Sequence, residues 1–155
     1  MILRSLGLLK FRKQFRNRDI EVIQIFSKIK NSVLIGKIVK PGNFTSRIDL
    51  TENEAILQIS AINFNKFQEV KSHKHLPLHR DTIGTSEIWL VTKGKFHIKL
   101  FDIDNSKIGE FKLGLGDLVV FFDGGHSLTA MSKNARILEV KNGPYEGADL
   151  DKVYI

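Results

Sequence analysis

The feature that most constrains the fold is a succession of short apolar runs, each closed by glycine, asparagine, aspartate or lysine, from about residue 45 onward. Within these runs β-branched and aromatic residues alternate with polar ones, which is the period of a strand with one buried face. Strands are predicted at residues 45–50, 55–64, 86–92, 95–101, 109–113, 118–122, 127–131 and 136–141. Many short strands in one chain favour a closed or double-sheet β-barrel, because an open sheet leaves its strand edges unpaired.

Length and composition fit one compact domain with its own core, since the chain has 155 residues and 42% of them are hydrophobic. The absence of cysteine excludes disulfides, thiolate zinc sites and cysteine nucleophiles, and agrees with a reducing compartment. No apolar run approaches the roughly 18 residues of a membrane span. We therefore expect a cytoplasmic, all-β protein in which residues 1–50 form a basic segment and first strands that pack on a barrel formed by residues 51–155.

Positive charge is concentrated at the N-terminus. The net charge is +7, and six lysine and arginine residues precede the first acidic residue, Asp19. Leu3, Leu6 and Leu9 fall at helical spacing, which predicts a short helical or extended segment with one apolar edge, and the helical pattern continues to about Lys30. We interpret this segment as an arm on the body or on a second subunit. A nucleic-acid role, a membrane-surface role and an organelle-targeting peptide are the alternatives.

Histidines indicate a metal centre. His73 and His75 are one residue apart, and on a strand their side chains would point to one face with Cα atoms roughly 6.6 Å apart, so both imidazoles could bind one ion. Glu87 follows at the start of a predicted strand, and His126 follows two glycines after another. Each has an ordinary alternative: His73 and His75 as surface residues, His126 as a turn residue, and Glu87 as the partner of a basic side chain, Arg80 or Lys95.

Two groups of these residues resemble the sequence motifs of the cupin superfamily. The first group is His73-Lys74-His75 with Glu87 and Gly94, and the second is Gly116-Asp117 with Gly124-Gly125-His126. This resemblance implies a jelly-roll barrel (a double-stranded β-helix), a divalent Fe, Mn, Ni or Zn ion held by His73, His75, Glu87 and His126, and a homodimer. The chain departs from the cupin pattern in a longer insertion before Glu87 and in Ala130, where cupins have asparagine.

The last ninety residues also resemble the small cupin-like proteins found among genes for surface-polysaccharide and nucleotide-sugar biosynthesis. The resemblance includes the segment from Glu139 to Tyr145 as well as the two motifs. It implies a small polar ligand of the sugar or sugar-nucleotide class. The reaction stays open between isomerase or epimerase chemistry, hydrolysis and oxygen chemistry, and the alternative is a non-catalytic binding module.

Four further residues bear on the composition of the site. His79 is a reserve ligand or acid–base group, although a solvated loop histidine is the plainer interpretation. Arg80 would suit an anionic ligand, and Trp89 could stack on a sugar ring or simply belong to the core. His97 lies on the polar face of its predicted strand, between Lys95 and Lys99, and is expected to be exposed.

Overall fold

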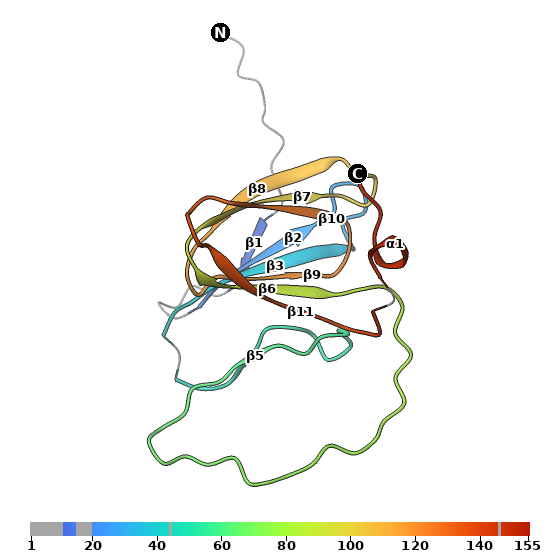
Figure 1. Cartoon of the computed structure of the whole chain (residues 1–155). Coiled ribbons are helices and arrows are strands. Elements are labelled where there is room, and N and C mark those ends of the chain that lie inside the picture. Colours follow the sequence, from blue (N-terminus) through green and yellow to red (C-terminus); the bar gives the residue numbers. More distant parts are fainter. Residues whose placement is uncertain (1–10, 15–19, 44, 146) are drawn as a thin grey trace.

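The computed structural model describes residues 11–14, 20–43, 45–145 and 147–155. In these residues the chain is built from antiparallel strands with one four-residue helix (Figure 1). The all-β prediction is therefore confirmed. The elements are β1 (Phe11–Gln14), β2 (Glu21–Phe26), β3 (Leu34–Lys40), β4 (Ile48–Asp49), β5 (Ser60–Ala61), β6 (Glu87–Lys93), β7 (Phe96–Phe101), β8 (Lys107–Leu113), β9 (Leu118–Phe121), β10 (Gly125–Ala130), β11 (Arg136–Lys141) and α1 (Ala148–Asp151).

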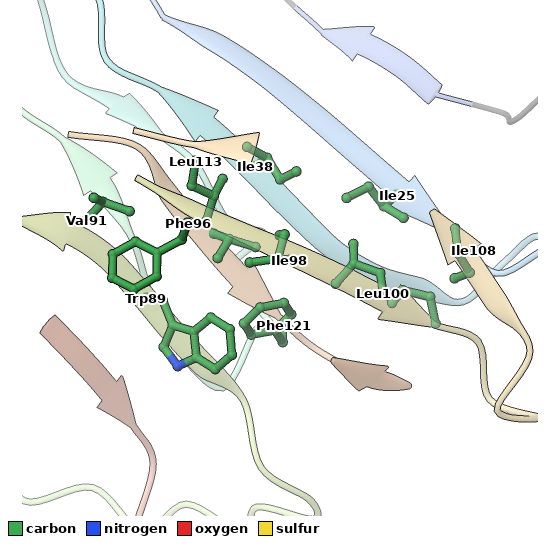
Figure 2. Packing of buried hydrophobic residues seen from close by; sticks show 12 residues of the cluster. Ile25, Ile38, Trp89, Val91, Phe96, Ile98, Leu100, Ile108, Leu113 and Phe121 are labelled. Carbon is green, nitrogen blue, oxygen red and sulfur yellow. The ribbon is translucent and has the colours of Figure 1, made fainter. Parts of the chain in front are cut away.

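Two sheets enclose the main core. The larger has the order β1-β2-β3-β9-β6-β11 and the smaller the order β10-β7-β8. Buried aliphatic and aromatic side chains from both sheets form one cluster (Figure 2). The cluster includes Ile25 from β2 and Ile38 from β3, so strands before residue 50 share a sheet and a core with the strands after it.

Strand β7 shows how sequence alternation fixes this packing. Phe96, Ile98 and Leu100 are buried, whereas His97 and Lys99 point to the other face. The alternation was predicted from the sequence and is confirmed. Strand β6 behaves in the same way, because Trp89 and Val91 are buried on the face that also carries Glu87.

A second, smaller cluster covers the outer face of the large sheet. It joins Ile20, Val22 and Val39 to Leu50, and the flanking residues Ile48, Ile59, Ala61 and Leu118 pack against it. Lys37 lies buried under this cover, and its ammonium donates to the backbone carbonyl of Leu50 at 2.9 Å. The two-stranded β4–β5 unit is therefore attached to the large sheet by both apolar and polar contacts.

Several local predictions were wrong. Residues 45–50 and 55–64 contribute only the two-residue strands β4 and β5. Between them the amide of Gln58 donates to the carbonyls of Glu52, Asn53 and Ala55, and these turn contacts replace a strand ladder. The prediction that the helical pattern continues to about residue 30 was also wrong. Residues 21–26 form strand β2, which pairs with β1 on one side and β3 on the other.

Strands β6 and β7 follow one another in the chain across Gly94, a layout that favours a hairpin, but they belong to different sheets and do not pair. Each strand buries an apolar face, so the chain crosses from one sheet to the other and lets both faces meet in the core. The predicted helix over residues 3–11 lies outside the described residues, apart from Phe11, which begins β1. Among the described residues no helix is long and apolar enough to cross a membrane.

Candidate functional site

Strands from both sheets bring a carboxylate and an imidazole together at one end of the core. Glu87 begins β6, and its partner in register on β9 is Phe121. His126 lies on β10 of the opposite sheet, next to the buried Leu100. The gap between the sheets is closed here by contact between His126 Nε2 and Glu87 Oε2, which lie 3.4 Å apart. Two of the predicted site residues therefore meet.

Aromatic rings hold this pair in place. The imidazole of His126 stacks on Phe121 with ring centroids 4.0 Å apart and planes 16° apart. Trp89 meets the same imidazole edge to face, with centroids 4.9 Å apart. His126 is consequently packed against two aromatic side chains, and only about a quarter (26%) of its side chain is exposed. Ring contacts of this kind fix the orientation of the imidazole toward Glu87.

Glu87 is ionised despite its partial burial. Burial is the largest single contribution and raises the pKa of Glu87, whereas hydrogen bonding and charge from His126 lower it. Trp89 and Glu139 add smaller contributions of the same sign, and the pKa of Glu87 falls below its ordinary value. The carboxylate is thus available as an acceptor over the whole neutral range.

The indole nitrogen of Trp89 has no hydrogen-bond acceptor in the described part of the chain, although it is buried. Its N–H helps to lower the pKa of Glu87 without reaching the geometry of a hydrogen bond. Figure 2 shows this nitrogen on the side of the ring that faces away from the aliphatic core. A buried donor without a partner is uncommon and calls for an acceptor from a ligand or a water molecule.

The margin of the site is formed by β11 and the C-terminal segment. Lys141 is the register partner of Glu87, and residues directly opposite one another in a sheet share a face. Its ammonium lies 2.7 Å from Asp151 Oδ2 and 4.1 Å from the ring centroid of Tyr145. The Asp151 carboxylate raises the pKa of Lys141, so this lysine is a cation.

His73 and His75 do not join this pair. Both lie exposed in a segment, residues 62–86, that contains no strand, so the expectation that they share a strand face was wrong. None of the described strands pairs with this segment, and His73 Nδ1 instead bonds the carbonyl oxygen of Lys71 at 2.8 Å. Their imidazoles are nevertheless close, with ring centroids 5.4 Å apart.

The remaining candidates lie outside the contact between Glu87 and His126. His79 and Arg80 are exposed in the same segment, and His79 Nε2 lies 2.9 Å from Asp81. The alternative pairing of Glu87 with Arg80 or Lys95 is not seen, since Glu87 contacts His126. His97 points away from the core as predicted, but it is half-buried because Glu110 Oε2 lies 3.2 Å from its Nε2.

The four predicted metal ligands are arranged as two separate pairs. Within the described residues no group of three or more histidine, aspartate and glutamate side chains converges on one point. Glu87 and His126 form one pair, and His73 and His75 form the other. Each pair supplies two ligand side chains, whereas a four-ligand metal centre requires four. The metal centre stays a prediction.

Sequence reasoning missed the residues of the margin. Glu139, Lys141 and Tyr145 belong to the segment that carries the cupin-like resemblance. Only the register of β11 against β6 places Glu139 beside Trp89 and Lys141 beside Glu87, and Tyr145 then contacts the Lys141 ammonium. Asp151 and Thr85 have no local signal at all, because their contact joins residues 66 positions apart.

Comparison with known proteins finds no protein family, no curated protein and no solved structure that matches this chain.

Proposed function

We propose that this protein binds a small polar ligand of the sugar or sugar-nucleotide class at the cluster formed by Glu87, Trp89, Phe121 and His126. Trp89 supports the proposal most directly, because its buried N–H has no acceptor among the described residues and a ligand hydroxyl or carbonyl oxygen could supply one. Leaving such a donor unpaired costs about 1–3 kcal/mol, which a ligand would recover. Sugars combine hydroxyl groups with an apolar ring face and so suit a site with both polar and aromatic walls.

The His126–Glu87 pair gives this site a means of moving a proton. Glu87 is the ionised acceptor, and the imidazole of His126 beside it is the kind of side chain that general acid–base catalysis uses most often. Isomerases and epimerases need such a group next to a hydroxyl or an acidic carbon. We therefore place isomerase or epimerase chemistry first. The alternative is a non-catalytic binding module that uses the same side chains for recognition alone.

A divalent ion is a second candidate for the same region, as in the cupin resemblance. Each of the two separate pairs, Glu87 with His126 and His73 with His75, offers such an ion two nitrogen or oxygen donors. When bound, such an ion would polarise a ligand oxygen. Elemental analysis of untagged protein tests this candidate. Stoichiometric Fe, Mn, Ni or Zn that is lost in His75→Ala and His126→Ala would support it, and metal-free protein that gains no thermal stability from these ions would contradict it.

Ligand binding can be read from the fluorescence of Trp89, because it is the only tryptophan in the chain. We expect at least one sugar or sugar nucleotide from a panel to change this fluorescence in the wild type and not in His126→Ala. His97→Ala is the matched control, since both histidines have a side-chain exposure of 26% and face a glutamate. Identical behaviour of the two variants, or no response to any member of the panel, would contradict the proposal.

Turnover separates the enzyme from the binding module. Incubation of the protein with a ligand in deuterated water, followed by mass spectrometry, measures any exchange of carbon-bound hydrogen that proton transfer produces. Exchange that disappears in Glu87→Gln while ligand binding persists would favour an isomerase or epimerase. Ligand binding without exchange would favour the binding module.

We also propose a homodimer. Exposed apolar residues support it, both in the segment 62–86 and on the outer face of the edge strand β11, where Leu138 and Val140 are 54% and 45% exposed. A free strand edge with apolar side chains is a surface that a second copy can cover.

A further inference from the structure

The C-terminal segment places the carboxylate of Asp151 beside the site, between the side chains of Lys141 and Thr85. These two side chains, with Tyr145 beneath the ammonium, form what we call the cradle. Asp151 receives the ammonium of Lys141 at 2.7 Å and the hydroxyl of Thr85 at 3.4 Å, one on each of its oxygens. Tyr145 lies beneath the ammonium. Lys141 and Thr85 flank Glu87, the first by its register on β11 and the second by being two residues earlier in the chain.

Within the part of the chain that the structure describes, few other contacts hold Asp151 against Lys141 and Thr85. Helix α1 is four residues long and buries none of its side chains. Leu150, Val153 and Tyr154, on either side of the contact, are each more than three-quarters exposed. Figure 1 shows α1 and the C-terminus at the end of the two sheets where β6 begins. The carboxylate is thus carried on a segment that can leave the cradle without uncovering a core.

The end of the chain lies over the opposite strand of the site. The side chain of Ile155 packs next to Gly125, where an added Cβ atom would come within 2.5 Å of its Cδ1. Gly125 directly precedes His126. The C-terminal segment therefore contacts the margins of both halves of the site, at Lys141 beside Glu87 and at Gly125 beside His126.

We propose that Lys141 and Thr85 form a subsite for an anionic oxygen group, and that Asp151 fills it as an internal substitute until a carboxylate or phosphate group of the ligand displaces it. The proposal rests on the proposed function for its location. It adds that the ligand carries negative charge, that Lys141 determines this specificity, and that binding releases the C-terminal segment. A lysine held by one oxygen anion can exchange it for another at little cost, because the contact being replaced is of the same kind.

Calorimetric titration with inorganic pyrophosphate and with malonate, at constant ionic strength, tests the subsite without any sugar. Asp151→Asn keeps the shape of the side chain and removes its charge. We expect pyrophosphate or malonate to bind this variant about three- to fivefold more tightly than the wild type, the gain from removing one ion-pair competitor. The anion that binds more tightly identifies the ligand group as phosphate or carboxylate.

Two matched variants decide the outcome. Asp149→Asn makes the same charge change on the same helix, at an exposed position outside the cradle, and should leave affinity at the wild-type value. Lys141→Met should abolish binding of both anions. Equal affinities of Asp151→Asn and Asp149→Asn would overturn the proposal, as would anion binding that survives in Lys141→Met.

A measurement on the wild-type chain guards against a variant that fails to fold. The amides of Asp151 and Lys152 donate to the carbonyls of Gly147 and Ala148. Saturating anion should accelerate their hydrogen exchange, because displacement of Asp151 frees α1. Unchanged exchange at saturation would overturn the proposal. Failure of neutral sugars to affect Trp89 would leave these anion experiments intact, so the two proposals can fail separately.

Discussion

Asp102 illustrates how one polar residue can organise the fold away from the site. Its carboxylate is fully buried and accepts the backbone N–H groups of Lys28 at 2.6 Å and Ile103 at 2.8 Å. Burial raises the pKa of Asp102, but these bonds and one from the Ser27 hydroxyl together outweigh burial and lower it. Asp102 therefore connects the turn after β2 to the turn after β7 as a charged acceptor.

Replacing Asp102 with asparagine should destabilise the protein by about 1–3 kcal/mol at neutral pH, because the amide carries no charge and brings donors of its own. The pKa is lower in the folded state, so the stabilisation is complete above the unfolded-state pKa and disappears as the pH falls through the folded-state value. Urea unfolding at a series of pH values should show the two proteins converging in acid. Asp104→Asn, an exposed change in the same turn, is the control, and an equal loss there would contradict the role assigned to Asp102.

Residue-scale predictions succeeded where the local sequence alone determines orientation. The outward direction of His97 follows from alternation within one strand. The same rule puts Glu87 on the face of β6 that carries Trp89 and Val91. His73 and His75 also alternate, but a strand needs a neighbour with free backbone groups, and that neighbour is a property of distant sequence. The contact of Glu87 with His126 depends on two sheets facing each other, which no local pattern encodes.

At the scale of elements, the pairing of β3 with β9 depends on a close backbone approach. Gly36 faces Phe121 in register, and a Cβ atom added at Gly36 would lie 2.5 Å from the carbonyl oxygen of Val120. A backbone oxygen cannot yield as the end of a flexible side chain can. Only glycine allows these two strands to sit at their observed spacing.

Gly36→Ala should therefore lower the free energy of unfolding by about 1–3 kcal/mol or more, as overpacking of a rigid site does. Chemical denaturation measures the loss. Gly114→Ala is a suitable control, because the nearest atom to its added Cβ, a carboxylate oxygen of Asp117, is 4.0 Å away. Similar stabilities of the two variants would show that β3 and β9 can move apart without cost.

The strands after residue 86 were predicted within a few residues, whereas those between 45 and 64 were not. The later runs alternate and end at turns with glycine or a tight polar loop, such as Gly116 before β9. The earlier segment contains equally apolar residues, but Leu50 and Ile59 contribute to a cover over the outer face of the large sheet. Apolar content predicts burial in both cases, and only sheet pairing distinguishes a strand from a covering loop.

At the scale of the whole molecule, the distribution of apolar side chains is uneven. Every residue from 62 to 85 is exposed. Seven large hydrophobic residues lie in this stretch: Ile62, Phe64, Phe67, Val70, Leu76, Leu78 and Ile83. Long segments without secondary structure are uncommon in compact domains, and this one is too apolar to resemble a solvated linker. Apolar surface on this scale is typical of contact with another chain.

Replacing Leu76, Leu78 and Ile83 together with serine should weaken self-association by more than about tenfold, because truncated apolar anchors carry much of an interface's free energy. Sedimentation velocity over a range of concentrations measures the change. The melting temperature of the monomer should not fall, since none of the three side chains packs in either core cluster. A second variant with Leu115 and Met131, which are 70% and 61% exposed elsewhere, replaced by serine removes apolar area outside the segment and should dimerise normally. A wild-type chain that stays monomeric at high concentration, or equal effects of the two variants, would mean that this segment is not the dimer contact.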